Sequence, residues 1–160
     1  MSNRMRNVLA CLSLSAALAP PCLARAEPYA VLGASPVEGL SVVDVATVRR
    51  SGPYWRAWAY VVLPEHKPQR VYLEASELEF DCARKRNRMV SGVRYDDKAK
   101  PLVTSKKVEA WTPVAANTPA AGMQRQVCQG AFDPTRLRGQ GKTIHQYAAE
   151  MRPLLPRLDR

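Results

Sequence analysis

The sequence predicts an α+β domain in which a small β-sheet carries a helix near its C-terminal end, and one disulfide ties that helix to the sheet. Three observations lead to this fold class. Apolar and polar residues alternate in β-branched and aromatic runs between residues 40 and 105. After Thr118 the apolar residues recur at helical spacing. Cys82 and Cys128 remain once an export signal is set aside, one in each region.

Residues 1–26 are predicted to be a signal peptide that is removed on export. Two arginines precede a run of small apolar side chains over residues 8–19, and residues 24–26 place alanine at the two positions that a leader peptidase reads. The apolar run has 12 residues, whereas a membrane-spanning helix needs about 20. We therefore expect cleavage near Ala26, a periplasmic or secreted protein, and no stable membrane span.

An uncleaved membrane anchor and a lipoprotein are the alternatives to a cleaved signal peptide. Lipidation would need Cys11 or Cys22 at the processing site. Cys11 lies too early to leave an apolar segment before it, and Cys22 follows two prolines, which are a poor approach to a lipid-transfer site. The cleaved signal peptide is the preferred interpretation.

Residues 27–39 are predicted to be an irregular lead-in, because Gly33, Pro36 and Gly39 interrupt them. Residues 40–49 form a β-branched run and are predicted to be a strand. Residues 54–63 carry apolar side chains on both faces, which is typical of a central strand. Another extended segment begins at Val71.

Acidic and apolar residues alternate after Glu77. Leu78, Phe80 and Cys82 share one face of the predicted strand, and the acids between them share the other. The apolar positions change from even to odd numbers by Met89. Because strand faces repeat every two residues, a bulge or a tight turn is expected between Cys82 and Met89.

The end of the predicted sheet is a hairpin loop at residues 96–101 and a short strand at residues 102–105, with residues 108–111 as a candidate for another strand. A helix is then predicted from Thr118, a hydroxyl N-cap followed by proline, to Gly130.

The segment 130–160 is predicted to be a tail with a second short helix at residues 143–152, where apolar residues form one stripe before Pro153. Whether this tail docks on the domain is not decided by the sequence, and neither is the oligomeric state.

Cys82 and Cys128 are predicted to form one disulfide, because two cysteines in an exported chain most often pair. Two free thiols are the alternative. The first cysteine lies on a predicted strand and the second on the predicted helix, so the bond would pin the helix to the sheet. No Cys-x-x-Cys motif supports redox chemistry.

No residue pattern argues for catalysis, a cofactor or a metal. His66 and His145 are the two histidines, too few for a His-rich metal site, and each is interpreted as a solvated side chain. Residues 141–143 are similar to the end of a phosphate-binding loop, but Arg136 stands where that motif needs glycine. The acids of residues 74–81 are interpreted as cross-strand ion pairs rather than a glycosidase pair. We expect a non-enzymatic protein.

The chain carries 24 lysines and arginines against 14 acids, a net charge of +10. Arg84, Lys85, Arg86 and Arg88 are the candidate ligand-binding residues, for a polyanionic glycan or another anionic partner. If the three arginines alternate along a strand, they form a row of charges about 7 Å apart. The alternative is a solvated edge that opposes aggregation. No nucleic-acid recognition motif is present, and nucleic acid is not expected as a partner.

Four segments resemble the surface-adhesin protein E family of Gram-negative bacteria: residues 79–84 (Glu-Phe-Asp-Cys-Ala-Arg), 95–96 (Tyr-Asp), 111–113 (Trp-Thr-Pro) and 127–128 (Val-Cys). The resemblance covers about residues 40–129. It implies a small antiparallel β-sheet whose C-terminal helix is tethered to the sheet by one disulfide, and an adhesive function with host extracellular-matrix proteins as partners. A periplasmic structural, accessory or inhibitor-like protein with no adhesive role is the alternative.

Overall fold

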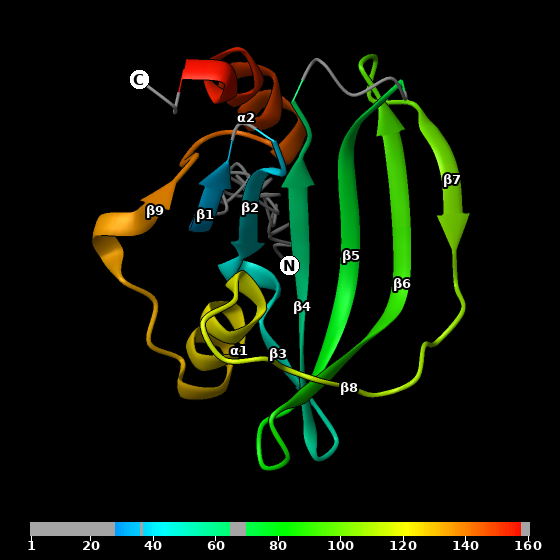
Figure 1. Ribbon diagram of the computed structural model, residues 1–160, viewed down its shortest axis with the longest axis vertical. Helices are drawn as coiled ribbons and strands as arrows, with labels where there is room; N and C mark the ends of the chain where they lie inside the picture. Colours follow the sequence, from blue (N-terminus) through cyan, green and yellow to red (C-terminus); the bar gives the residue numbers. More distant parts are fainter. Residues whose placement is uncertain (1–27, 36, 65–69, 158–160) are drawn as a thin grey trace, which may run out of the picture.

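The structure, a computed structural model, describes residues 28–35, 37–64 and 70–157 (Figure 1). Within these residues one antiparallel sheet of nine strands has the order β7-β6-β5-β4-β2-β1-β9, with β3 paired to β4 and β8 paired to β6. The strands are β1 (Tyr29–Ser35), β2 (Gly39–Asp44), β3 (Arg49–Ser51), β4 (Tyr54–Val62), β5 (Val71–Asp81), β6 (Arg86–Asp96), β7 (Pro101–Ser105), β8 (Thr112–Pro113) and β9 (Leu137–Arg138).

The helices are few, so a mostly antiparallel sheet with a helix near its C-terminal end is consistent with the predicted α+β class. They are α1 (Pro119–Gln129), α2 (Ile144–Met151) and the 3-10 helices η1 (Val45–Thr47), η2 (Pro134–Arg136) and η3 (Arg152–Arg157). The predicted signal peptide, residues 1–26, and His66 lie outside the described residues.

The strand β1 occupies most of the segment that the sequence predicted to be irregular. The prediction of irregular backbone is wrong for residues 29–35, because β1 pairs antiparallel with β2 along its length. Gly39 enters β2 at φ 105°, where a Cβ atom would lie 2.2 Å from the Val62 carbonyl oxygen. The pairing also slips between Val31 and Gly33. The glycines therefore mark a turn and a bulge in a regular strand pair.

The run at residues 40–49 is divided rather than continuous. β2 ends at Asp44, whose Oδ1 accepts a hydrogen bond from the backbone N–H of Ala46 at 3.0 Å and caps η1. β3 then begins at Arg49. β4 lies between β2 and β5, so the prediction of a central strand is confirmed.

The sequence predicted a bulge or a tight turn after Cys82, where the apolar positions change from even to odd numbers. The structure has a tight turn there, over residues 82–85, with Lys85 at φ 50°. The predicted hairpin loop between β6 and β7 is confirmed as well. No strand forms at residues 108–111; the Glu109 N–H donates to the Met89 carbonyl at 2.9 Å, and the two-residue β8 follows instead.

Each face of the sheet has its own apolar core and its own helix. Neighbouring residues alternate between the cores: Tyr29 and Val42 face α2 and η3, whereas Ala30 and Val43 face α1. Phe80 is fully buried in the core under α1. In Figure 1 the helices lie over the β1–β2–β4 half of the sheet, and β6 and β7 extend beyond them.

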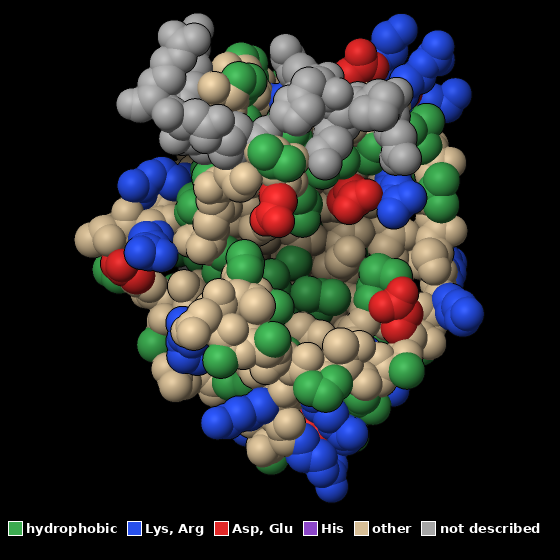
Figure 2. Space-filling view, in the orientation of Figure 1, with side chains coloured by type: hydrophobic (Ala, Val, Ile, Leu, Met, Phe, Trp, Pro, Cys, Tyr) green, Lys and Arg blue, Asp and Glu red, His purple; other side chains and the backbone are tan. Residues whose placement is uncertain are grey.

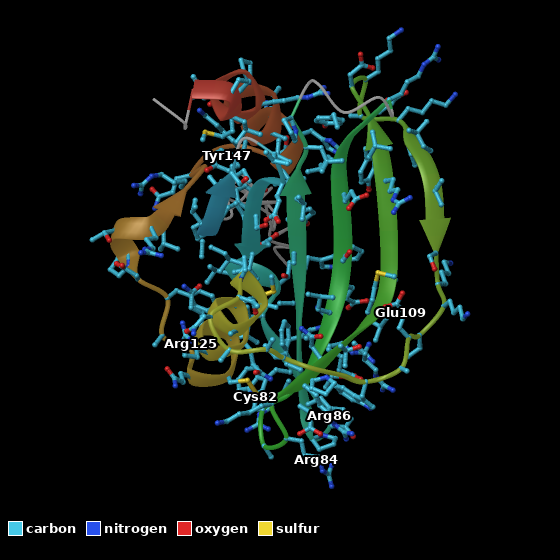
Figure 3. The ribbon with its side chains drawn as sticks, viewed as in Figure 1. Cys82, Arg84, Arg86, Glu109, Arg125 and Tyr147 are labelled. Carbon is cyan, nitrogen blue, oxygen red and sulfur yellow. A yellow bond between two sulfur atoms is a disulfide. The ribbon has the colours of Figure 1, made fainter. Side chains whose placement is uncertain are left out.

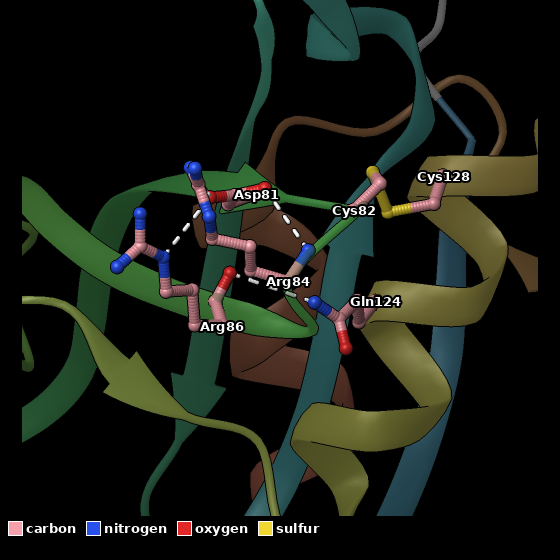
Figure 4. Close-up of a disulfide and its surroundings, with 6 residues drawn as sticks. All are labelled: Asp81, Cys82, Arg84, Arg86, Gln124 and Cys128. Atoms are coloured by element: carbon pink, nitrogen blue, oxygen red, sulfur yellow. Dashed lines mark hydrogen bonds and ion pairs between the residues drawn. A yellow bond between two sulfur atoms is a disulfide. The ribbon is translucent and has the colours of Figure 1, made fainter.

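The helix α1 and its disulfide agree with the sequence prediction. The Thr118 Oγ1 accepts a hydrogen bond from the Ala121 N–H at 3.2 Å, and Gly130 ends the helix at φ 64°. The Cys82–Cys128 disulfide joins the end of β5 to the last turn of α1, with the two Cα atoms 5.8 Å apart (Figure 4).

The tail after Gly130 docks on the sheet, a point that the sequence left open. β9 pairs with the start of β1, and α2 and η3 bury Tyr147, Ala148 and Leu155 against the sheet. The predicted second helix is confirmed as α2, with Thr143 as its N-cap. Residues 130–157 therefore belong to the same folded body as the sheet.

Candidate functional site

The register of β4, β5 and β6 brings arginines of two strands to the acids of the strand between them. Alternation places Glu77, Glu79 and Asp81 of β5 on one face, opposite the face of α1. Arg56 of β4 and Arg88 of β6 both stand directly beside Glu79. We call the set of side chains on this face the arginine ladder; its members are Arg49, Arg56, Arg84, Arg86, Arg88, Glu77, Glu79 and Asp81.

Glu79 is the buried centre of the ladder, with a side chain that is 2% exposed. Its Oε1 accepts a hydrogen bond from Arg56 Nε at 2.9 Å. Its Oε2 accepts two from Arg88, from Nε at 2.8 Å and from Nη2 at 2.6 Å. The predicted cross-strand ion pairs are therefore confirmed, and one carboxylate holds two arginines together.

Asp81 anchors the other end of the ladder, at the turn after β5. Its Oδ1 accepts a hydrogen bond from the Arg84 N–H at 3.1 Å, and its Oδ2 accepts one from Arg86 Nε at 2.9 Å (Figure 4). Burial raises the pKa of this carboxyl, but the hydrogen bonds from Arg84 and Arg86 outweigh burial, and the pKa lies below its usual range.

Asp81 is therefore expected to contribute to acid lability. Its pKa is depressed in the folded protein, so its contribution is present above the unfolded pKa of about 4 and is lost as the pH falls through the folded value. We expect Asp81→Asn to be less stable at neutral pH and to lose less stability on acidification than the wild type. Urea midpoints at neutral and acid pH measure both. Parallel pH profiles for the two proteins would contradict this assignment.

Two aromatic rings cover the arginine ladder. The Trp111 ring lies 4.3 Å from the Arg88 guanidinium carbon and 4.8 Å from that of Arg86. Tyr54 packs against Trp111, with ring centroids 4.8 Å apart. Cation–π contacts of this kind reduce the water around a guanidinium while it keeps its charge. The segment that leads into β8 thus shields Arg86 and Arg88.

The four candidate ligand-binding residues fall into two groups. Arg86 and Arg88 are about three-quarters covered, with 29% and 26% of their side chains exposed, and both pair with buried carboxylates. Arg84 is 69% exposed, and Lys85 is exposed beside it in the turn. Figure 3 shows Arg84 and Arg86 at the lower end of the sheet. The expected row of three equivalent cations does not form, and ligand binding by these residues stays a prediction.

A neighbouring hairpin adds a cation that sequence reasoning missed. Arg50 of β3 is exposed, and its guanidinium carbon lies 4.7 Å from the Trp55 ring centroid. β3 pairs with β4, and Trp55 of β4 stands beside Phe80 near the end of β5, so the two hairpin ends are neighbours. We call Arg50, Arg84 and Lys85 the cationic tip. Figure 2 shows lysine and arginine side chains gathered at this end.

Sequence reasoning also missed Arg49, Arg56 and Tyr54, and it named Trp111 only for the family resemblance, with no role at this site. The sequence did contain one signal for these residues, because alternation along β4 places Tyr54 and Arg56 on the same face of the strand. Their partners could not be named because the register between β4 and β5 is not a local property of the chain.

The part of the chain that the structure describes holds no group of three or more His, Cys, Asp or Glu side chains arranged to hold a metal ion. None of its helices is both long and apolar enough to cross a membrane.

Comparison with known proteins gives one match. The model of a protein family described as surface-adhesin protein E matches residues 32–129, from within β1 to the last residue of α1. The match includes both cysteines of the disulfide and the whole arginine ladder. No curated protein and no solved structure matches the chain.

Proposed function

Since the family match covers more than half of the chain, this chain belongs to the surface-adhesin protein E family, and on that premise we propose that it is an exported, non-enzymatic binding protein whose cationic tip holds an anionic ligand. The family is one of surface adhesins, which favours a binding protein over an enzyme. Host-matrix molecules that carry polyanionic glycans are the ligands that fit both the family and the charge.

The surplus of cations at one end of the sheet carries the proposal. The arginine ladder and the cationic tip together hold seven cations, namely Arg49, Arg50, Arg56, Arg84, Lys85, Arg86 and Arg88. The same two sets include the three carboxylates Glu77, Glu79 and Asp81, and seven minus three leaves four positive charges.

The three carboxylates are largely covered, with 14%, 2% and 6% of their side chains exposed, while Arg84 is 69% exposed. The carboxylates of the ladder are therefore covered by their arginine partners, while cations of the tip meet the solvent. An extended polyanion that approaches the tip does not meet these three carboxylates directly, and charge dominates contacts of this kind.

We expect the exported protein to be retained on immobilised heparin and to elute with salt. Arg84→Gln with Lys85→Gln should weaken the affinity by roughly threefold or more, because each lost contact between an exposed cation and a polyanion contributes a few tenths of a kcal/mol to about 1 kcal/mol. The reduction should shrink as salt shortens the screening length, which is about 8 Å at physiological ionic strength. Titration with soluble heparin at several salt concentrations measures the effect.

The matched control is Lys98→Gln with Lys100→Gln, in the hairpin at the opposite end of β6. It removes the same charge from exposed positions. Arg86 and Arg88 are left intact because they hold buried carboxylates, and their loss would disturb the fold. An equal loss of affinity in both double variants would show that net charge alone retains the protein. Absence of heparin binding together with strict periplasmic retention would favour the accessory or inhibitor-like alternative.

A further inference from the structure

The outer edge of β1 is only partly used by the sheet. β2 pairs with β1 along its length, but β9 pairs with it only at Tyr29 and Ala30. Among the described residues no strand pairs with the outer edge of residues 31–35. The reason lies before β9, where Asp133 caps the 3-10 helix η2 that begins at Pro134 and turns the chain away from β1. Backbone groups of an unused strand edge are a template for another strand.

A groove of about 490 Å³ runs beside this edge. Its walls are mostly apolar: Val31 and Leu32 come from β1, and Tyr147 and Met151 come from α2. Gly33 also lines the groove, and a Cβ atom placed there would meet nothing within 4 Å. The groove therefore has room for side chains that project from a strand lying along β1.

Tyr147 supplies an unused polar group at the groove. The residue is 4% exposed and stacks on Tyr29, with ring centroids 5.5 Å apart. Its hydroxyl has no hydrogen-bond partner in the described part of the chain. Figure 3 shows Tyr147 where α2 meets the sheet. Buried hydroxyls normally have a partner, so the α2 wall of the groove carries a polar group that the described fold leaves unsatisfied.

The rim of the groove is positively charged. Arg136 and Arg138 are exposed on one side, and Lys142 pairs with Glu150 on the other. The lining residues hold three cations against one carboxylate. Asp133 lies outside the lining, 3.8 Å from Arg136, and counting its carboxylate as well still leaves one positive charge at the rim.

We propose that this β1 groove binds an extended, acidic segment of a partner protein, which adds a strand to the outer edge of β1. The edge supplies main-chain hydrogen bonds, the apolar walls take alternate side chains, and the rim takes the acidic ones. A fatty-acid-like anion would fit the apolar walls and the rim, but it has no backbone with which to use the strand edge. This groove lies apart from the cationic tip and does not depend on the function proposed for it.

The test uses the exported protein and a capped octapeptide in which valine and glutamate alternate, with the valine–lysine peptide as its charge-reversed counterpart. We expect the glutamate peptide to bind, the lysine peptide to bind at least about tenfold more weakly, and the amides of residues 31–35 to exchange more slowly with solvent when the glutamate peptide is bound. Calorimetry gives the affinities, and hydrogen exchange locates the peptide.

Two variants test the groove itself. Gly33→Phe fills it and should weaken binding by about tenfold or more, whereas Thr104→Phe adds the same ring on exposed β7, at the opposite edge of the sheet, and should not. Arg136→Gln with Arg138→Gln should weaken binding by roughly threefold, more than Lys98→Gln with Lys100→Gln. The charge variant keeps the proposal testable if Gly33→Phe fails to fold.

Three results would overturn the proposal. One is unchanged affinity in Gly33→Phe. Another is peptide binding that leaves the exchange of residues 31–35 as it was. The third is saturable binding of dodecanoate in the groove while the glutamate peptide fails to bind or to displace it.

Discussion

Replacing Cys128 by serine is expected to lower the free energy of unfolding by about 4 kcal/mol. The disulfide links residues 46 positions apart, and opening that loop returns conformational freedom to the unfolded chain. Domains of this kind are commonly stable by about 5–15 kcal/mol, so the variant should lose a large part of its stability. Urea unfolding of the exported, oxidised protein and of the variant measures the difference.

The folded state of Cys128→Ser should keep α1 in place, because Met123 and Val127 remain buried against the sheet. Hydrogen exchange of α1 should nevertheless be faster, since the last turn of the helix is no longer tied to β5. The wild type in reductant serves as the control, because it loses the bond and keeps the sulfur atoms. Equal urea midpoints for the oxidised wild type, the reduced wild type and Cys128→Ser would contradict the expectation.

The features that the sequence predicted correctly are mostly local ones. Thr118 before Pro119 predicted the start of α1, and the stripe after Thr143 predicted α2, because capping and helical spacing involve residues within a few positions of one another. The turn after Cys82 followed from the change of phase along one strand pair. The disulfide was predicted because only Cys82 and Cys128 remain once the signal peptide is set aside.

The features that the sequence did not reveal depend on contacts between distant segments. Residues 29–35 become a strand because β2 and β9 pair with them, and β9 is more than 100 positions away along the chain. From the sequence, Arg86 and Arg88 were interpreted as exposed cations that could bind an anionic ligand. The register of β6 against β5 places them beside Asp81 and Glu79, and Trp111 covers them from a later segment. One residue of slip in that register would have turned both arginines to the other face.

The same register of β6 against β5 makes Arg88 a structural residue. Arg88→Ala is expected to lower the free energy of unfolding by about 3 kcal/mol, because its removal leaves the buried Glu79 carboxylate poorly compensated. Glu79 is 2% exposed and would keep only Arg56. The variant also removes the guanidinium on which Trp111 lies. Urea or thermal unfolding at neutral pH measures the loss.

Arg94→Ala is the matched control for Arg88→Ala, on the same strand and with the same change of charge. Its Nε lies 2.9 Å from Glu74 Oε1, but the two side chains are 53% and 34% exposed. Solvent screens such a pair, so the cost should stay within about 0.5 kcal/mol. The contrast between the two variants isolates the effect of burying the carboxylate.

A third protein, Arg88→Ala combined with Glu79→Gln, separates a buried charge from lost packing. If the cost of Arg88→Ala arises from an uncompensated carboxylate, neutralising Glu79 should make the double variant less unstable than the sum of the two single variants, with a coupling of about 1 kcal/mol or more. Strictly additive losses would mean that Arg88 stabilises the fold through its contact with Trp111 and not through Glu79. A cost for Arg88→Ala no larger than that of Arg94→Ala would mean that Arg56 alone satisfies Glu79.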